Sequence, residues 1–122
     1  KKGSKDKLKL GNLKAKRDWG HAKDYVEAMW LMLQKDSPDD YVIGTGEKHS
    51  VEEFAEKAFS HVGLNYKDHI VIDQKLMRPA DVDTLLADYS KAKKNLKWKP
   101  KISFDDLIID MVEQDLENIN KF

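Results

Sequence analysis

The sequence contains no cysteine, which excludes disulfide bonds, thiolate nucleophiles and zinc–thiolate sites. It also has no long apolar run, because charged residues interrupt every apolar stretch within a few positions. Neither a membrane span nor a secretion signal is therefore expected. We expect a soluble, cytoplasmic protein without a membrane partner. Its 122 residues are enough for one compact domain with a core of its own.

A glycine-rich turn for a dinucleotide cofactor is missing as well. The six glycines do not form the G-x-x-G-x-x-G pattern that seats a pyrophosphate on a helix N-terminus. Gly44 and Gly46 stand close together but lack the third glycine, so an ordinary exit from a strand explains them better. The sequence thus indicates no catalytic, cofactor-binding or metal-binding residue.

Charge is distributed unevenly, although the net charge is zero. The first seventeen residues carry eight Lys and Arg residues against one acid, Asp6. A basic arm of this kind can bind nucleic acid, but this one has no aromatic residue to stack on bases. We therefore expect residues 1–7 to be a solvated, disordered arm and do not expect nucleic acid as a partner.

Hydrophobic periodicity predicts more helix than strand. Three apolar runs are predicted as short strands, at 8–10, 41–44 and 70–72. Apolar stripes at helical spacing follow the capping residues Asp18, Ser50 (with Glu53) and Ser103, and Ser90 is predicted to cap a short helix that ends at Leu96. The pattern indicates a single α/β domain, residues 1–122, without internal repeats.

An arginine and an aromatic-polar turn, Arg17-Asp18-Trp19-Gly20-His21, precede the first predicted helix. A planar guanidinium can pair bidentately with a diphosphate, and backbone N–H groups point the same way where a chain enters a helix. The alternative from spacing alone is a surface ion pair of Arg17 with Asp18 or Asp24, worth less than about 1 kcal/mol. His21 could be a general base. No carboxylate or nucleophile is placed by the sequence to work with it, so a structural role is favoured.

A second arginine lies in a proline turn, Arg78-Pro79-Ala80-Asp81. Proline fixes the turn and orients Arg78, and Asp81 can accept hydrogen bonds from vicinal hydroxyls such as those of a ribose. Diphosphate and ribose together indicate a nucleotide, whereas the alternative is a surface ion pair in a loop. On the nucleotide hypothesis, Arg17, Arg78 and Asp81 should converge on one face of the fold.

These motifs are followed by Ser90-Lys91-Ala92 and by Leu96-Lys97-Trp98-Lys99-Pro100, in which Trp98 is expected to be buried. In this order they resemble the C-terminal part of the GDP-mannose 4,6-dehydratase family of extended short-chain dehydrogenases/reductases. The resemblance runs from about Leu8 to Leu116. It implies an α/β, helix-rich, C-terminal substrate-binding portion of a longer protein, with the Rossmann half absent.

The resemblance also implies which residues bind the substrate. In the family, the arginine matching Arg17 lies beside the nucleotide-sugar, and the residues matching Arg78 and Asp81 contact its diphosphate and ribose. The family usually has Glu where this chain has Asp81, which shortens the reach of the carboxylate by one methylene.

The activity implied is the conversion of GDP-mannose to GDP-4-keto-6-deoxymannose with a tightly held NADP. In the family the cofactor site and the catalytic groups, including a Tyr-x-x-x-Lys pair, lie in the N-terminal dinucleotide-binding half. Tyr89 and Lys93 match that spacing only formally. We therefore expect this chain to be inactive alone, with GDP-mannose and the N-terminal half as partners, and to form a homo-oligomer. Two alternatives stay open: the same region of another nucleotide-sugar epimerase or reductase, and a stand-alone interaction module.

Overall fold

A computed structural model of the chain describes residues 3–121. Residues 1 and 2 of the predicted basic arm, like residue 122, lie outside the described residues. Residues 3–7 are exposed and form no helix or strand.

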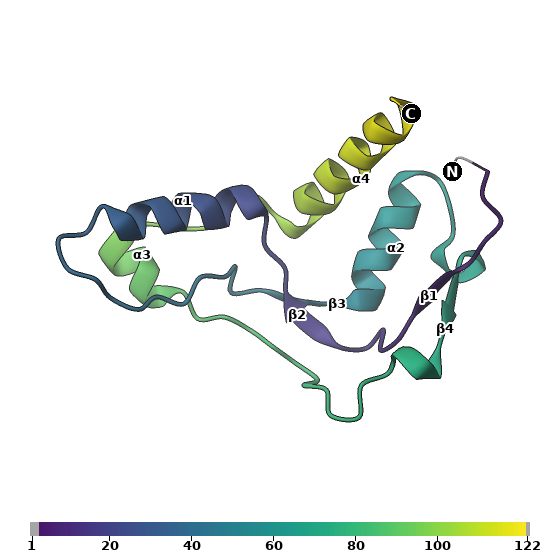
Figure 1. Ribbon diagram of the computed structural model, residues 1–122, viewed down its shortest axis with the longest axis horizontal. Helices are drawn as coiled ribbons and strands as arrows, with labels where there is room; N and C mark the ends of the chain where they lie inside the picture. Colours follow the sequence, from purple (N-terminus) through teal and green to yellow (C-terminus); the bar gives the residue numbers. More distant parts are fainter. Residues whose placement is uncertain (1–2, 122) are drawn as a thin grey trace.

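Within the described residues the chain forms four α-helices and four three-residue strands (Figure 1). The helices are α1 (Ala22–Leu33), α2 (Val51–His61), α3 (Ser90–Leu96) and α4 (Phe104–Asn120). The strands are β1 (Leu8–Leu10), β2 (Lys16–Asp18), β3 (Lys48–Ser50) and β4 (Ile70–Ile72). Two single-turn 3₁₀ helices, η1 (Tyr66–Asp68) and η2 (Gln74–Leu76), flank β4. None of the helices in 3–121 is long and apolar enough to cross a membrane.

The strands form two separate pairs rather than one sheet. β1 runs parallel to β4, with Leu8 opposite Ile70, and β2 runs antiparallel to β3. The predicted strands at 8–10 and 70–72 are therefore confirmed and pair with each other. β2 and β3 were not predicted, because their sequences are polar and show no apolar alternation.

The predicted strand at 41–44 is wrong, since these residues form no strand. A strand needs a neighbour to receive its backbone hydrogen bonds, and no strand pairs with this segment within 3–121. Tyr41 and Ile43 instead pack against the helical core. The apolar run predicted burial correctly for part of the segment but not its backbone conformation.

Two helices begin where their predicted capping residues directly precede them in the sequence. Ser50 and Glu53 form the predicted capping box of α2, and the Ser103 hydroxyl accepts a hydrogen bond from the Asp106 N–H at the start of α4. The predicted cap of α1 is wrong: His21, not Asp18, caps this helix. Ser90 is the first residue of α3 and makes no cap, contrary to prediction.

The core lies between α1 and α3, which pack against each other (Figure 1). Ala28 and Ala92 are completely buried, and the small side chains let the two helices approach closely. Trp98 fills the space beyond α3 and is 1% exposed, as predicted. Its indole Nε1 donates a hydrogen bond of 2.9 Å to the Asp24 carbonyl. A second packing contact joins α2 to α4.

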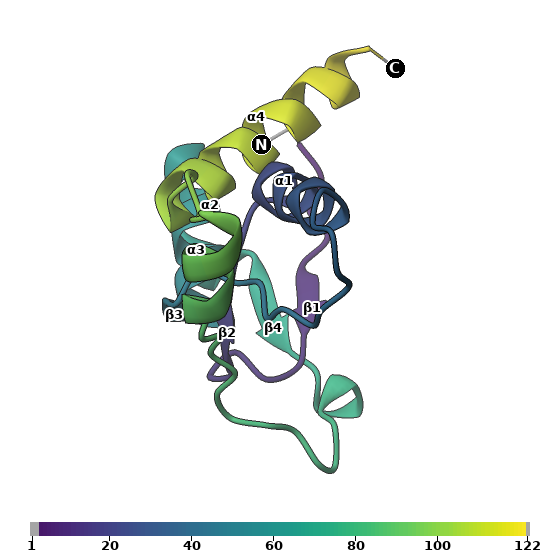
Figure 2. The same cartoon turned by 90° about the vertical axis from the view of Figure 1, so that its left-hand side faces the viewer.

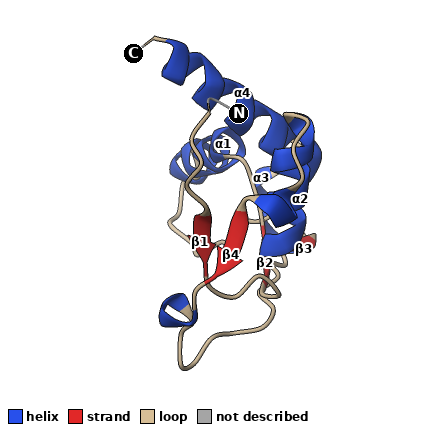
Figure 3. Cartoon of the chain, turned by 90° about the vertical axis from the view of Figure 1, so that its right-hand side faces the viewer, coloured by secondary structure: helices blue, strands red, loops and turns tan. Residues whose placement is uncertain are grey.

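Residues 77–89 form a long loop between η2 and α3 (Figures 2 and 3). Both views show this loop extending beyond the strands, away from α4. The loop includes Arg78 and Asp81, so its attachment to the rest of the fold determines where these side chains lie.

One face of α1 exposes large apolar side chains. Val26, Met29, Trp30 and Leu33 recur at i, i+3, i+4 and i+7 and are all exposed, Trp30 by 60% and Leu33 by 81%. Trp30 therefore takes no part in the core of this chain. A contiguous apolar stripe of this kind favours association.

We expect the isolated 122-residue chain to self-associate through this face and to bind a dye for apolar surfaces. Sedimentation should show the double variant Trp30→Lys/Leu33→Lys shifted towards monomer. Asp36→Lys, which changes charge just beyond the helix, is the control. A wild-type chain that stays monomeric at high concentration and binds no dye would contradict this prediction.

Candidate functional site

The polar strand β2 anchors the loop of residues 77–89. The Lys16 N–H donates to the Asp83 carbonyl at 2.8 Å. Two residues on, the Asp18 carboxylate accepts a hydrogen bond of 3.2 Å from the Ala87 N–H. The Leu85 N–H also donates to the Lys16 carbonyl at 3.0 Å, so Lys16 and Asp18 of β2 both anchor the second half of the loop.

Arg17, between these two anchors, pairs with Asp81. Its Nη2 lies 2.8 Å from Asp81 Oδ1, and its Nη1 donates to the Lys16 and Val82 carbonyls at 2.8 and 2.7 Å. The two charged side chains are 26% and 21% exposed, so the pair is partly shielded from water. The alternative pairing, of Arg17 with Asp18 or Asp24, does not form. Arg17 also lies in a strand and not at a helix N-terminus, because α1 begins at Ala22.

Arg78 is exposed and makes no hydrogen bond or ion pair with any residue of 3–121. Together with Arg17 and Asp81 it lines a pocket of about 290 Å³. The other residues around this pocket are Leu10, Gly11, Asn12, Ala15, Val51 and Leu76. The tertiary structure thus places the three predicted site residues around one pocket. Arg17 is paired with Asp81, whereas Arg78 has no partner within residues 3–121.

The Asp18 carboxylate does not cap a helix and instead accepts several hydrogen bonds from distant residues. Its Oδ1 accepts from Thr45 N–H at 2.8 Å and from Thr45 Oγ1 at 2.7 Å, and its Oδ2 accepts from Gly46 N–H at 3.0 Å. Gly44 lets the backbone come this close: a Cβ there would lie 2.9 Å from Asp18 Oδ2 and would collide with the Ala87 side chain. The turn around Gly44 and Gly46 is therefore packed against protein atoms.

His21 has a structural place in the fold. Its Nδ1 accepts a hydrogen bond from the Lys23 N–H, so Nε2 carries the proton and donates to Asp110 Oδ2 at 2.7 Å. This hydrogen bond holds the pKa of the Asp110 carboxyl below its usual value. The sequence could not reveal this carboxylate partner, because it is contributed by the distant helix α4. His21 is only 8% exposed, and both ring nitrogens are occupied.

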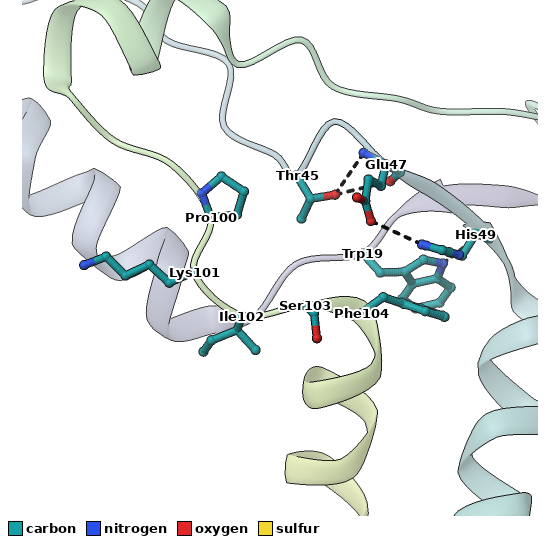
Figure 4. Close-up of a pocket in the computed structure, with 9 residues that line it drawn as sticks. All are labelled: Trp19, Thr45, Glu47, His49, Pro100, Lys101, Ile102, Ser103 and Phe104. Atoms are coloured by element: carbon teal, nitrogen blue, oxygen red, sulfur yellow. Dashed lines mark hydrogen bonds and ion pairs between the residues drawn. The ribbon is translucent and has the colours of Figure 1, made fainter.

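A second hollow, of about 210 Å³, lies between the Thr45–Glu47 turn and the segment before α4 (Figure 4). The His49 ring stacks on Phe104 with centroids 3.9 Å apart. Its Nδ1 bonds to Glu53, which lowers the pKa of that carboxyl, and its Nε2 has no hydrogen-bond partner within 3–121. Sequence reasoning missed this hollow, because three separate segments form it.

The indole Nε1 of Trp19 donates to the His49 carbonyl at 2.9 Å, and its ring packs on Phe54. Lys101, although it borders the hollow, pairs with Glu27 and turns its ammonium away (Figure 4). This hollow therefore offers no free cation, unlike the pocket at Arg78. No cluster of metal-binding side chains occurs within the described part of the chain.

The model of the family described as GDP-mannose 4,6 dehydratase matches residues 1–111. The chain belongs to this family. GDP-mannose 4,6 dehydratase 1 of Arabidopsis thaliana is 57% identical over 96% of this chain and 32% of its own length. The human GDP-mannose 4,6 dehydratase is 51% identical, over 94% of this chain and 36% of its own length. The chain thus spans about a third of the curated relatives it matches.

Solved structures with the same fold come from related nucleotide-sugar enzymes. The UDP-glucose 4-epimerase of Thermotoga maritima, with UDP-glucose, superposes with a TM-score of 0.81 at 27% identity, over 93% of this chain and 36% of the epimerase chain. The dTDP-glucose 4,6-dehydratase of Bacillus anthracis, in complex with NAD, also gives 0.81, over 93% of this chain and 35% of that one. At 24% identity the latter likeness shows the fold alone. The chain therefore has the α/β fold of a portion of the extended short-chain dehydrogenases/reductases.

Proposed function

We propose that this chain is the nucleotide-sugar-binding part of an enzyme that converts GDP-mannose to GDP-4-keto-6-deoxymannose. The observation that carries the proposal is the pocket in which Arg17, Arg78 and Asp81 meet. Membership of the GDP-mannose 4,6 dehydratase family supports the choice of substrate. The identity of 57% to a dehydratase, against 27% to the epimerase, favours the dehydratase over a sister enzyme.

Each of the three residues has a distinct role in this proposal. Arg78 is the free cation of the pocket and pairs with the diphosphate as a planar, bidentate donor. Arg17 is held beside it by Asp81 and adds a second positive charge. Asp81 binds Arg17 through Oδ1, and its Oδ2, which faces Asn12 at 3.5 Å, keeps a lone pair that can accept a hydrogen bond from a ribose hydroxyl.

We further propose that NADP and the catalytic residues belong to the portion of the enzyme that this chain does not include. The residues present do not fit a dinucleotide: the turn at Gly44 is filled by Asp18 and Ala87, where a pyrophosphate would need open backbone. Bound in that portion, the cofactor would accept a hydride from C4 of the sugar and return it to C6. This chain alone should bind the nucleotide-sugar without converting it, and the homo-oligomeric state and cytoplasmic location stay predictions.

Replacing Arg78 by alanine in the full-length enzyme should weaken GDP-mannose binding by about 2–3 kcal/mol, the range for losing a charge-assisted contact. NADP binding should stay nearly unchanged. Isothermal titration of both ligands measures the two effects separately. Arg78→Lys should recover part of the affinity, because it keeps the charge but not the bidentate geometry.

Lys57→Ala is the control for general loss of positive charge. Lys57 pairs with Asp105 between α2 and α4, outside the arginine pocket, so this variant should bind GDP-mannose as the wild type does. Arg17→Ala should act in the same direction as Arg78→Ala. Normal GDP-mannose binding by both arginine variants would refute the proposed site.

A further inference from the structure

We propose that Asn12 is a positioning residue of this pocket. It holds the Asp81 carboxylate, and through it the Arg17 guanidinium, in the geometry that receives the nucleotide-sugar. The inference rests on the proposed function of the pocket and adds a residue that no motif in the sequence indicates. Asn12 lies in the short segment between β1 and β2 and lines the pocket.

The orientation of the Asn12 amide is set by a local turn. Its Oδ1 accepts a hydrogen bond of 3.0 Å from the Lys14 N–H. The oxygen of the amide therefore faces the backbone, and the NH₂ group is the end that faces Asp81. Asn12 Nδ2 lies 3.5 Å from Asp81 Oδ2. The amide thus presents a donor, and not an acceptor, to the carboxylate.

The backbone around Asn12 is firmly attached. The Leu13 carbonyl accepts from the Glu52 N–H at 3.0 Å, which ties the segment to the start of α2. On the other side, Gly11 lies against the Leu76 backbone, where a Cβ would come within 2.6 Å of the Leu76 oxygen. The backbone at Asn12 is therefore held in place beside the mostly exposed loop of residues 77–89.

Asp81 bridges Asn12 and Arg17. Oδ1 bonds to Arg17 and Oδ2 faces Asn12, so both oxygens of the carboxylate have a partner. A contact of 3.5 Å contributes little to stability by itself. The contact instead fixes the orientation of the Asp81 carboxylate, because the Asn12 NH₂ group at Oδ2 opposes its rotation. A carboxylate that does not rotate keeps its hydrogen bond to Arg17 and so holds the guanidinium in place. Asn12 does not need to touch the ligand for this role.

Asn12→Asp tests the proposed role, because it keeps the oxygen that accepts from the Lys14 N–H and replaces the NH₂ donor by a negatively charged carboxylate oxygen. The new carboxylate stands beside Asp81 and repels it. In the full-length enzyme we expect the dissociation constant for GDP to rise about tenfold, as for loss of a contact to a charged group. NADP affinity and the melting temperature should stay at their wild-type values.

Asn65→Asp is the matched control. Asn65 makes the same kind of turn, with its Oδ1 accepting from the Lys67 N–H at 3.1 Å, but at η1 and outside the pocket. This variant introduces the same charge in the same local geometry. It should bind GDP like the wild-type enzyme.

A double-mutant cycle distinguishes positioning through Asp81 from a purely structural role. In the Asp81→Ala background, Asn12→Asp should cause no further loss of GDP affinity, because the group it acts on is gone. Calorimetry at millimolar GDP keeps weak binding measurable. A structural role of Asn12 would instead lower the affinity equally in both backgrounds.

The inference is overturned if Asn12→Asp binds GDP like the wild type, or if its effect persists unchanged without Asp81. Failure of the proposed function looks different, because Arg78→Ala then binds GDP normally whatever Asn12 does. Weakened binding by Arg78→Ala together with an unaffected Asn12→Asp would reject only the role of Asn12.

Discussion

Replacing Trp98 by alanine should lower the free energy of unfolding of this chain by about 3–5 kcal/mol, the range for truncating a buried aromatic side chain. Trp98 is 1% exposed and packs on α1 and α3, with the Tyr89 ring edge-on at 5.7 Å between centroids. Truncation leaves a cavity among groups that cannot collapse fully. It also removes the indole N–H that donates a hydrogen bond to the Asp24 carbonyl, and this hydrogen bond is buried.

Urea unfolding followed by circular dichroism, at low protein concentration, measures this loss. Trp30→Ala is the matched control, because it removes the same side chain from a position that is 60% exposed in this chain. The control should change the unfolding free energy by less than about 1 kcal/mol. Equal effects of the two substitutions would show that Trp98 is not the centre of the core.

Asp18→Ala should be the most destabilising polar substitution, by about 2–3 kcal/mol. Its carboxylate accepts hydrogen bonds from three backbone N–H groups, those of Thr45, Gly46 and Ala87, and from the Thr45 hydroxyl. Alanine leaves these donors without an acceptor in a partly buried place, where water replaces it only in part. The turn after residue 44 and the end of the 77–89 loop should loosen together.

Hydrogen exchange provides the local measurement for Asp18→Ala. The amides of Gly46 and Ala87, which both donate to Asp18 Oδ2, should exchange faster in this variant, whereas the amide of Asp106 at the start of α4 should not. Asp18→Asn keeps one acceptor oxygen and should recover part of the stability. Unchanged exchange at Gly46 and Ala87 would refute the central position of Asp18.

Short-range signals in the sequence were sufficient for several elements. The capping box of Ser50 and Glu53 and the cap at Ser103 both depend on groups within a few residues of each other. These contacts form in the same way wherever the chain folds. The predicted start of α1 was wrong because the side chain of Asp18 makes contacts distant in the sequence. Asp18 has the right chemistry for a helix cap, but its carboxylate accepts hydrogen bonds from four donors of Thr45, Gly46 and Ala87 instead.

The amino-acid sequence was sufficient to predict the helices with local caps, the apolar strands β1 and β4, and Arg17, Arg78 and Asp81 as candidate site residues. It did not determine the polar strands β2 and β3, or that residues 41–44 form no strand, because pairing depends on which neighbour is present. The folded chain was needed to see that Arg17 pairs with Asp81, that Arg78 has no partner within residues 3–121 and that Asn12 faces the same carboxylate. These contacts could not be predicted because Arg17 and Asp81 are 64 residues apart, and folding of the backbone is what brings their charged atoms to 2.8 Å.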